Sequence, residues 1–252
     1  MNHKMQMKIS KRNLLRGAVT AVLATLPEAA LCDVPEADLQ ISPTTLLLAP
    51  GGVAIANLYN SGAGAGTAQV RIKRWTQDDA GDVLADTDDV VASPPFATLA
   101  PKSSQLLRIA DLSSPASADE TSYRLLVNQL PSAGALSGSQ VEILLAFSVP
   151  VFIAGSMQTP PDLSYSIVPR GQDMMLAIYN NGGSHARLTN LQLRAPSGAV
   201  LMAISGLAGY ALPKSTIMIK IPAAQAVAAV NAELFLQTQF NRQRQQISRR
   251  GG

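Results

Sequence analysis

The sequence predicts an all-β protein built from sandwiches of short strands. From Leu39 onward, runs rich in Val, Ile, Leu and Thr alternate with clusters of Gly, Pro, Asn and Ser, which are typical of turns. Helical patterns are few. The alanine-rich segment 223–230 follows Pro222, and we expect either a short helix or a loop with one turn there.

Residues 1–32 have the layout of a secretory signal peptide, in which basic residues precede an apolar run, GAVTAVLATL. This run has about ten residues, whereas a membrane-spanning helix needs about 20, so export is favoured over a retained helix. The small residues Ala30 and Cys32 favour cleavage after Cys32. The alternative, a lipoprotein with Cys32 lipidated, is disfavoured by the bulky Leu31 before it.

The positive charge of the chain belongs largely to this leader. The whole chain has 20 basic and 17 acidic residues, whereas residues 33–252 carry 15 basic and 16 acidic ones, so binding to nucleic acid is not expected. Because Cys32 is the only cysteine, the mature chain has no internal disulfide. About 220 residues are enough for one or two domains stabilised by burial of apolar surface.

The predicted strands fall into two sets, separated by the unpatterned segment AGSMQTPP at 154–161. We therefore expect one domain at 33–154 and a second at 155–252, ending in a basic tail that is frayed and solvated. The first carries 6 basic and 13 acidic residues and the second 9 basic and 3 acidic, which would favour their contact. We find no close internal sequence repeat.

Patterns for catalysis or metal binding are weak. His185 lies in a Gly/Ser turn, and we expect it at the surface. The acidic run 78–89 does not follow the spacing of a calcium loop and is expected to be a solvated hairpin tip. The chain has no G-x-S-x-G motif, and GAGAG at 62–66 does not match a dinucleotide fingerprint. We expect no enzyme activity, no cofactor and no metal site.

The segment 141–153, VEILLAFSVPVFI, is unusually apolar for a strand. Alternate residues share one face of a strand, and here that face is continuously apolar from Val141 to Ile153. Composition alone favours a central strand buried on both sides. The alternative is an edge strand that offers its side chains to a partner protein, because a long unprotected apolar edge otherwise promotes aggregation.

Several motifs in order resemble the periplasmic chaperones of the chaperone-usher pathway, which assemble pili. The motifs are LQISPTTLLLAPG, RWTQDD, VASPPFATLAPKSSQLLRI, SYRLLVNQLP and LLAFSVPVFIA in the first domain, and NNGGSHARLTNLQL and YALPKST in the second. The resemblance implies two immunoglobulin-like β-sandwich domains in an L-shaped arrangement, a periplasmic location, and no nucleotide or small-molecule substrate.

In that family the last strand of the first domain is inserted into a pilus subunit that lacks a strand, which is donor-strand complementation. Alignment of the strand through VPVFIA implies that the donor side chains are Val141, Ile143, Leu145 and Phe147. The implied partners are pilus subunits and an outer-membrane usher. An exposed apolar edge would also favour self-association of the free protein.

The family also binds the carboxyl terminus of the subunit on basic side chains of its first and last strands. Here those windows hold Thr44–Leu46 and Ser148–Pro150 and are not basic, which points to the archaic branch of the family. Arg124 is then the implied anchor, since it lies on the strand expected beside the donor strand, and Arg108 is a weaker second. Trp75 and Tyr123 are expected to be packing residues.

The function implied is a chaperone that keeps pilus subunits folded and delivers them to the usher for fimbria assembly. The alternative is an exported structural or adhesive β-sandwich protein, such as a fimbrial component. Pilus subunits are usually single incomplete domains, often with a disulfide, and this chain has neither trait.

Overall fold

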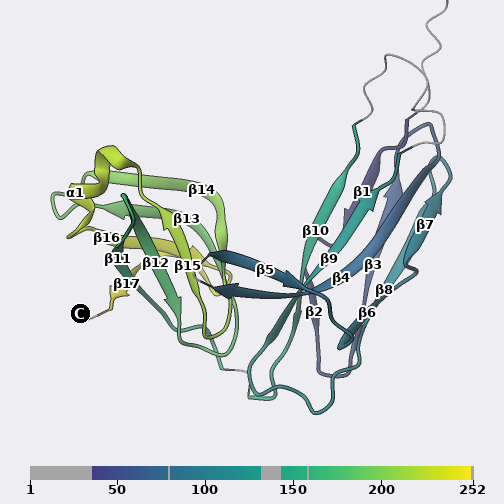
Figure 1. The fold of residues 1–252 in the computed structure, drawn as a ribbon, viewed down its shortest axis with the longest axis horizontal. Coiled ribbons are helices and arrows are strands. Elements are labelled where there is room, and N and C mark those ends of the chain that lie inside the picture. Colours follow the sequence, from purple (N-terminus) through teal and green to yellow (C-terminus); the bar gives the residue numbers. More distant parts are fainter. Residues whose placement is uncertain (1–35, 79, 132–142, 158, 251–252) are drawn as a thin grey trace, which may run out of the picture. The chain divides into compact units, whose positions relative to one another are not determined.

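The computed structural model describes residues 36–78, 80–131, 143–157 and 159–250 (Figure 1). The predicted signal peptide, 1–32, lies outside the described residues and stays a prediction. Among the described residues, no helix is long and apolar enough to cross a membrane. Strands dominate, so the predicted all-β class is confirmed.

The strands of the first half of the chain form two sheets. One has the order β1–β3–β8–β6, with β1 at Leu39–Ser42, β3 at Val53–Asn60, β8 at Ser104–Asp111 and β6 at Val90–Ser93. The other has the order β2–β10–β9–β4–β5, and β7 also pairs with β4. Its strands are β2 at Leu46–Leu48, β10 at Ala146–Ile153, β9 at Thr121–Gln129, β4 at Gly66–Asp78, β5 at Gly81–Ala85 and β7 at Phe96–Leu99.

The two sheets enclose one apolar core. Leu58 and Leu107 of one sheet and Leu125 and Val127 of the other are fully buried, and each alternates with more exposed neighbours along its strand. This alternation is the period-two pattern of strands with one face on a core. We call this unit the first sandwich.

The run 39–49, expected to form one strand, is divided between the two sheets. β1 pairs with β3, whereas β2 pairs in parallel with β10 in the other sheet. Pro43 lies between them, and proline has no N–H for a strand ladder, so pairing stops at this point. The division places β2 beside only part of β10.

The strands of the second half also enclose an apolar core, in the order β14–β13–β16–β17–β11–β12–β15. We call this unit the second sandwich. Its strands are β11 at Leu163–Arg170, β12 at Asp173–Asn180, β13 at Ala186–Arg194, β14 at Val200–Ala211, β15 at Thr216–Lys220, β16 at Glu233–Thr238 and β17 at Asn241–Arg249. The alanine-rich segment forms a 3-10 turn, η1 at Ala223–Gln225, and a short helix, α1 at Ala226–Ala229.

The basic C-terminal segment is a strand and not the frayed tail that the sequence suggested. β17 pairs antiparallel with β16 and, through Ser248, in parallel with β11. Ile247 is 6% exposed and joins the core of the second sandwich. The polar composition of this segment conceals the strand because only one of its residues is a large aliphatic one.

A short internal repeat, which the sequence analysis did not detect, closes both sandwiches. In the first, Asn60 is fully buried at the end of β3. Its side-chain carbonyl accepts hydrogen bonds from the backbone N–H groups of Asp38 (3.1 Å) and Gly62 (3.0 Å). Its amide donates to the carbonyl oxygens of Gly64 (2.8 Å) and Leu99 (3.3 Å).

Asn180 repeats this arrangement at the end of β12. Its carbonyl accepts from the backbone N–H groups of Asp162 (3.1 Å) and Gly182 (3.0 Å), and its amide donates to the carbonyl oxygens of Ser184 (2.8 Å) and Ala211 (3.0 Å). Each asparagine therefore joins three separate chain segments at one end of its sandwich.

The sequence carries the repeat as YNSG at 59–62 with LAPKSS at 99–104, and YNNG at 179–182 with ALPKST at 211–216. A Cβ at Gly62 would collide with the carbonyl oxygen of Glu36, and one at Gly182 with that of Pro160, so both positions require glycine. The sequence expectation of no close repeat did not include this short match. The match was hard to detect because it is confined to these turns.

We predict that Asn60→Ala lowers the stability of the mature chain by roughly 3 kcal/mol, because it leaves several buried backbone groups without partners. Denaturant unfolding checks this. Asn57→Ala is the matched control on the same strand, because the side-chain oxygen of Asn57 has no hydrogen-bond partner. Equal losses for the two variants would show that the network around Asn60 is not the cause.

Candidate functional site

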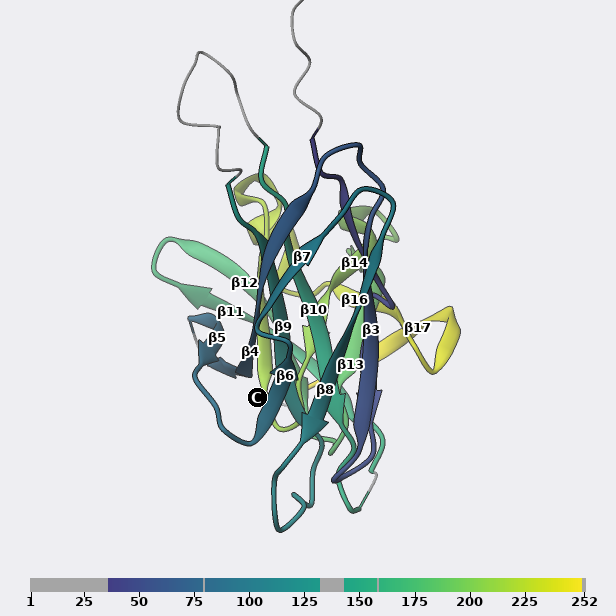
Figure 2. The same ribbon diagram turned by 90° about the vertical axis from the view of Figure 1, so that its right-hand side faces the viewer.

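The edge of β10 is paired along only part of its length. β10 pairs with β9 from Ala146 to Ile153, and the two strands lie side by side in Figure 2. β2 covers the opposite edge only from Val151 to Ile153. The edge of Ala146–Pro150 therefore has no strand partner among the described residues. Its backbone groups are available for pairing with another chain.

The side chains of β10 change from buried to exposed along the strand. Val149, Val151 and Ile153 are buried in the core of the first sandwich. Phe147 is half-buried on the same face, and Ile143, which precedes the strand, is 74% exposed. The apolar row predicted from the sequence thus serves the chain's own core at its C-terminal end and is exposed at its N-terminal end.

The strand is shorter than the sequence predicted, since it begins at Ala146 and not at Val141. Leu145 continues the pairing by one bond, from the backbone N–H of Gln129 to its carbonyl oxygen (2.8 Å), and it packs half-buried against the core. Val141 lies outside the described residues. The donor roles of Val141, Ile143, Leu145 and Phe147 stay predictions.

Arg124 lies in the middle of β9, opposite Pro150 of β10. Its guanidinium carbon is 3.6 Å from the centre of the Trp75 ring and 5.7 Å from that of Tyr210, and Asp82 is 3.8 Å away. The side chain is only 16% exposed. Burial lowers the pKa of Arg124, although the Asp82 carboxylate opposes this shift. Arginine nevertheless stays charged at neutral pH, so this cation is stabilised by an anionic ligand.

Arg124 lines a cleft of about 800 Å³. Besides Arg124, the described lining residues include one further arginine and several hydroxyl and amide side chains, and none of them is acidic. They are Thr44, Thr45, Ser148, Pro150, Arg187, Thr189, Asn190, Gly206, Leu207, Tyr210, Gln237, Thr238, Gln239 and Asn241. The cleft therefore has the charge and the hydrogen-bonding groups to bind a carboxylate. It also adjoins the free edge of β10 through Ser148 and Pro150.

Arg108 lies elsewhere. It is exposed on β8, in the other sheet of the first sandwich, where it pairs with Ile55 of β3 and Ser93 of β6. The structure does not bring it together with Arg124, and it does not line the cleft.

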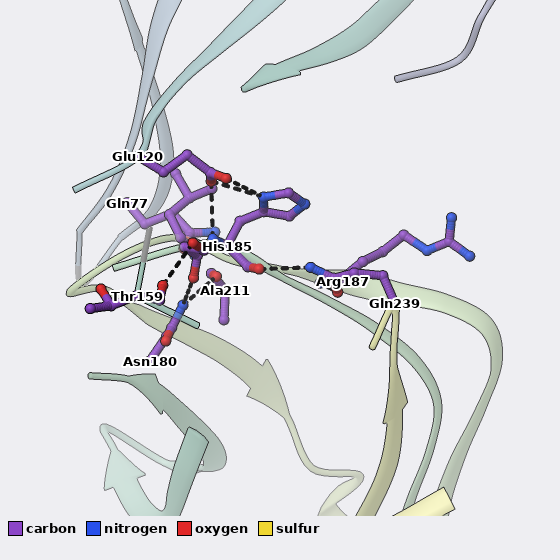
Figure 3. Close-up of polar contacts among 10 residues, drawn as sticks. Gln77, Glu120, Thr159, Asn180, His185, Arg187, Ala211 and Gln239 are labelled. Carbon is purple, nitrogen blue, oxygen red and sulfur yellow. Dashed lines mark hydrogen bonds and ion pairs between the residues drawn. The ribbon is translucent and has the colours of Figure 1, made fainter. Parts of the chain in front are cut away.

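His185 is not the surface residue that its Gly/Ser turn suggested. It is 9% exposed, and its ring lies 3.5 Å from that of Phe152 with an angle of 3° between the planes. Its Nδ1 lies 2.8 Å from the Glu120 carboxylate, which also accepts the backbone N–H of His185 (3.0 Å) (Figure 3). Sequence reasoning missed this pair because the two residues are 65 positions apart in polar turns.

Gln77 of β4 holds the backbone around Tyr210, whose ring lies beside Arg124. The side-chain amide of Gln77 donates to the carbonyl oxygen of Tyr210 (2.8 Å), and its carbonyl accepts the N–H of Leu212 (3.0 Å). Trp75 and Tyr210 belong to a small buried cluster, so the packing role predicted for Trp75 is confirmed. Tyr123, also fully buried, packs in the core of the first sandwich as predicted.

The acidic run 78–89 pairs with basic side chains more than the sequence suggested. Asp86 contacts Lys73, Asp89 lies 3.6 Å from Arg74, and Asp82 reaches Arg124. Among the described residues, no three His, Cys, Asp or Glu side chains come together in a group that could hold a metal ion.

The fold and the site define a class of protein: two β-sandwiches, with a partly open strand edge suited to strand addition beside a cationic cleft. Residues 38–156 match the family model described as pili and flagellar-assembly chaperone, PapD N-terminal domain. A search of curated protein sequences finds no match to this chain.

Solved structures of pilus and fimbrial chaperone systems have a similar fold. A chain of the CsuC–CsuE chaperone–tip adhesion subunit pre-assembly complex, from the archaic chaperone-usher Csu pili of Acinetobacter baumannii, matches with a TM-score of 0.69 and 21% identity, covering 85% of this chain and all of that one. A chain of the Salmonella enterica SafA pilin–SafB chaperone complex matches with a TM-score of 0.58 and 13% identity, over 84% and 96%. The E. coli chaperone DraB matches with a TM-score of 0.57 and 14% identity, covering 84% of this chain and 98% of that one.

We predict that Gln77→Ala increases hydrogen exchange at the Leu212 amide roughly tenfold, because this N–H loses its acceptor. Mass-spectrometric or NMR exchange measurements check this. Gln105→Ala is the control, since that side chain is exposed and bonds only to the adjacent Leu106 carbonyl. Unchanged protection of Leu212 in Gln77→Ala would contradict the role assigned to this contact.

Proposed function

We propose that this chain is a periplasmic chaperone that binds pilus subunits by donor-strand complementation and delivers them to an outer-membrane usher. The observation that carries the proposal is the half-paired strand β10, whose Ala146–Pro150 edge is open. The match of residues 38–156 to the assembly-chaperone family model supports the same function.

The open end of β10 offers both components of strand addition. Its backbone can form a ladder with a subunit that lacks a strand, and Ile143, Leu145 and Phe147 can enter the subunit's apolar groove. With Val141 as a fourth, burial at about 1.5 to 3 kcal/mol for each side chain would contribute roughly 6 to 12 kcal/mol before ordering costs. This range is sufficient for a stable complex.

Arg124 is the proposed anchor for the carboxyl terminus of the subunit. The proposal is supported by its burial, its charge and its position opposite Pro150, at the inner end of the open edge. A strand added along Ala146–Pro150 would end beside this guanidinium. Thr44, Thr45 and Ser148 supply hydroxyl groups to the same cleft.

Further features of the proposal come from the sequence and the family. They are cleavage of a signal peptide at residue 32, domains at 33–154 and 155–252, membership of the archaic branch and the absence of enzyme activity. The archaic branch is supported by the likeness to the Csu complex and by the uncharged windows at Thr44–Leu46 and Ser148–Pro150.

We expect Ile143→Asp to reduce recovery of a co-expressed pilus subunit from the periplasm at least tenfold, because a charge would have to enter an apolar groove. Ile143 is mostly exposed, so the variant chaperone should keep its own yield and thermal stability. Leu106→Asp, an exposed leucine of the other sheet, is the matched control and should retain the subunit. Full subunit recovery with Ile143→Asp would refute the donor-strand assignment, and no recovery with the wild-type chain would refute the chaperone function.

For the anchor, we expect Arg124→Ala to lower subunit recovery roughly tenfold, because it removes a charge-assisted contact with the terminal carboxylate. Arg108→Ala changes the charge equally on an exposed face outside the cleft and should leave recovery unchanged. Thermal unfolding of each variant separates a binding loss from a folding loss. If Arg108→Ala has the larger effect on recovery, the assignment to Arg124 is wrong.

A further inference from the structure

A second arginine lines the same cleft and comes from the other sandwich. Arg187 is exposed near the start of β13, and its backbone N–H donates to the side-chain oxygen of Gln239 (2.7 Å) (Figure 3). Its guanidinium makes no ion pair or hydrogen bond with the residues that the structure describes. This charge is thus available to a ligand.

Tyr210 neighbours both arginines. Arg187 and Tyr210 are cross-strand partners on β13 and β14, so their side chains leave the same face of the sheet. The ring of Tyr210 in turn lies 5.7 Å from the guanidinium carbon of Arg124. Tyr210 itself is nearly buried and is held by Gln77, which gives the arrangement a fixed centre.

The charges of the cleft are not balanced. Arg124 has one acidic neighbour, Asp82, in an ion pair at 3.8 Å; the Asp82 side chain is half exposed and also accepts a hydrogen bond from Gln77 (2.9 Å). Neither Asp82 nor any other acidic residue that the structure describes lines the cleft. Two guanidinium groups beside neutral hydroxyls and amides form a site for one small anionic group, since a carboxylate accepts hydrogen bonds at both oxygens.

We infer that Arg187 is the second cation that binds the carboxyl terminus of the client subunit, so that this carboxylate is held by both sandwiches. The inference rests on the proposed chaperone function and adds a residue of the second sandwich to the anchor. Its consequence is that a client is recognised by where its chain ends, because the carboxylate has to reach both arginines.

The test uses the full chain with a candidate pilus subunit that co-purifies with it. The subunit is made in two forms, one with its native terminus and one extended by two glycines, which moves the carboxylate away by up to about 7 Å. Purified complexes are mixed with excess unlabelled wild-type chaperone, and the release rate of the subunit is measured at low and high salt.

We expect Arg187→Ala to release the native subunit roughly tenfold faster than the wild-type chain does. With the extended subunit the same substitution should change the rate less than twofold, because the carboxylate no longer lies between the arginines. Arg187→Lys, which keeps the charge, should restore most of the difference. Salt should accelerate release from the wild-type chain more than from Arg187→Ala.

Arg170→Ala is the matched control, since Arg170 is an exposed arginine of the second sandwich that does not line the cleft. It should behave as wild type. If Arg187→Ala affects both subunit forms equally, or neither, the inference is wrong while the chaperone function stands. If the wild-type chain binds no subunit, the proposed function is wrong, and the inference about Arg187 is wrong as well.

Discussion

The partial pairing of β10 is the constraint on which the site depends. At Val151–Ile153 the strand lies between β2 and β9 and its side chains fill the core, so this end is held in place. The end at Ala146–Pro150 continues the same strand with one edge open. A strand fixed at one end is already extended and in register with β9, which lowers the ordering cost of adding a partner strand. In the proposed function, the Val151–Ile153 end of β10 would thus serve stability and the Ala146–Pro150 end would serve binding.

The same strand also links this edge to the cleft. Phe152 points to the opposite face from Val151 and Ile153, where it packs near Trp75 and stacks on His185. Trp75 in turn supports the Arg124 guanidinium. Displacement of β10 would therefore disturb the aromatic cluster and the Arg124 side chain together. In the proposed function, this would tie the register of an added strand to the position of its carboxyl terminus.

The acidic and basic side chains around the cleft are distributed unevenly. Three acidic residues of 78–89, Asp86, Asp89 and Asp82, pair with Lys73, Arg74 and Arg124 respectively. The cleft is lined by two arginines and by no carboxylate from the part of the chain that the structure describes. The opposite net charges of residues 33–154 and 155–252 are thus less informative than the local pairing, because exposed charges on the two surfaces are screened by solvent and salt.

The sequence by itself determined the all-β class, most of the strands and the apolar character of 141–153, because period-two alternation and turn residues are local signals. The anchor role of Arg124 came from the resemblance to the family and stays a prediction. Only the tertiary structure decided that β10 is half open, because the register of β2 depends on where Pro43 ends β1. Likewise, His185 is buried by Glu120 and Phe152, and Arg187 reaches the cleft through its pairing with Tyr210. These contacts join residues far apart in the chain, so no local pattern predicts them.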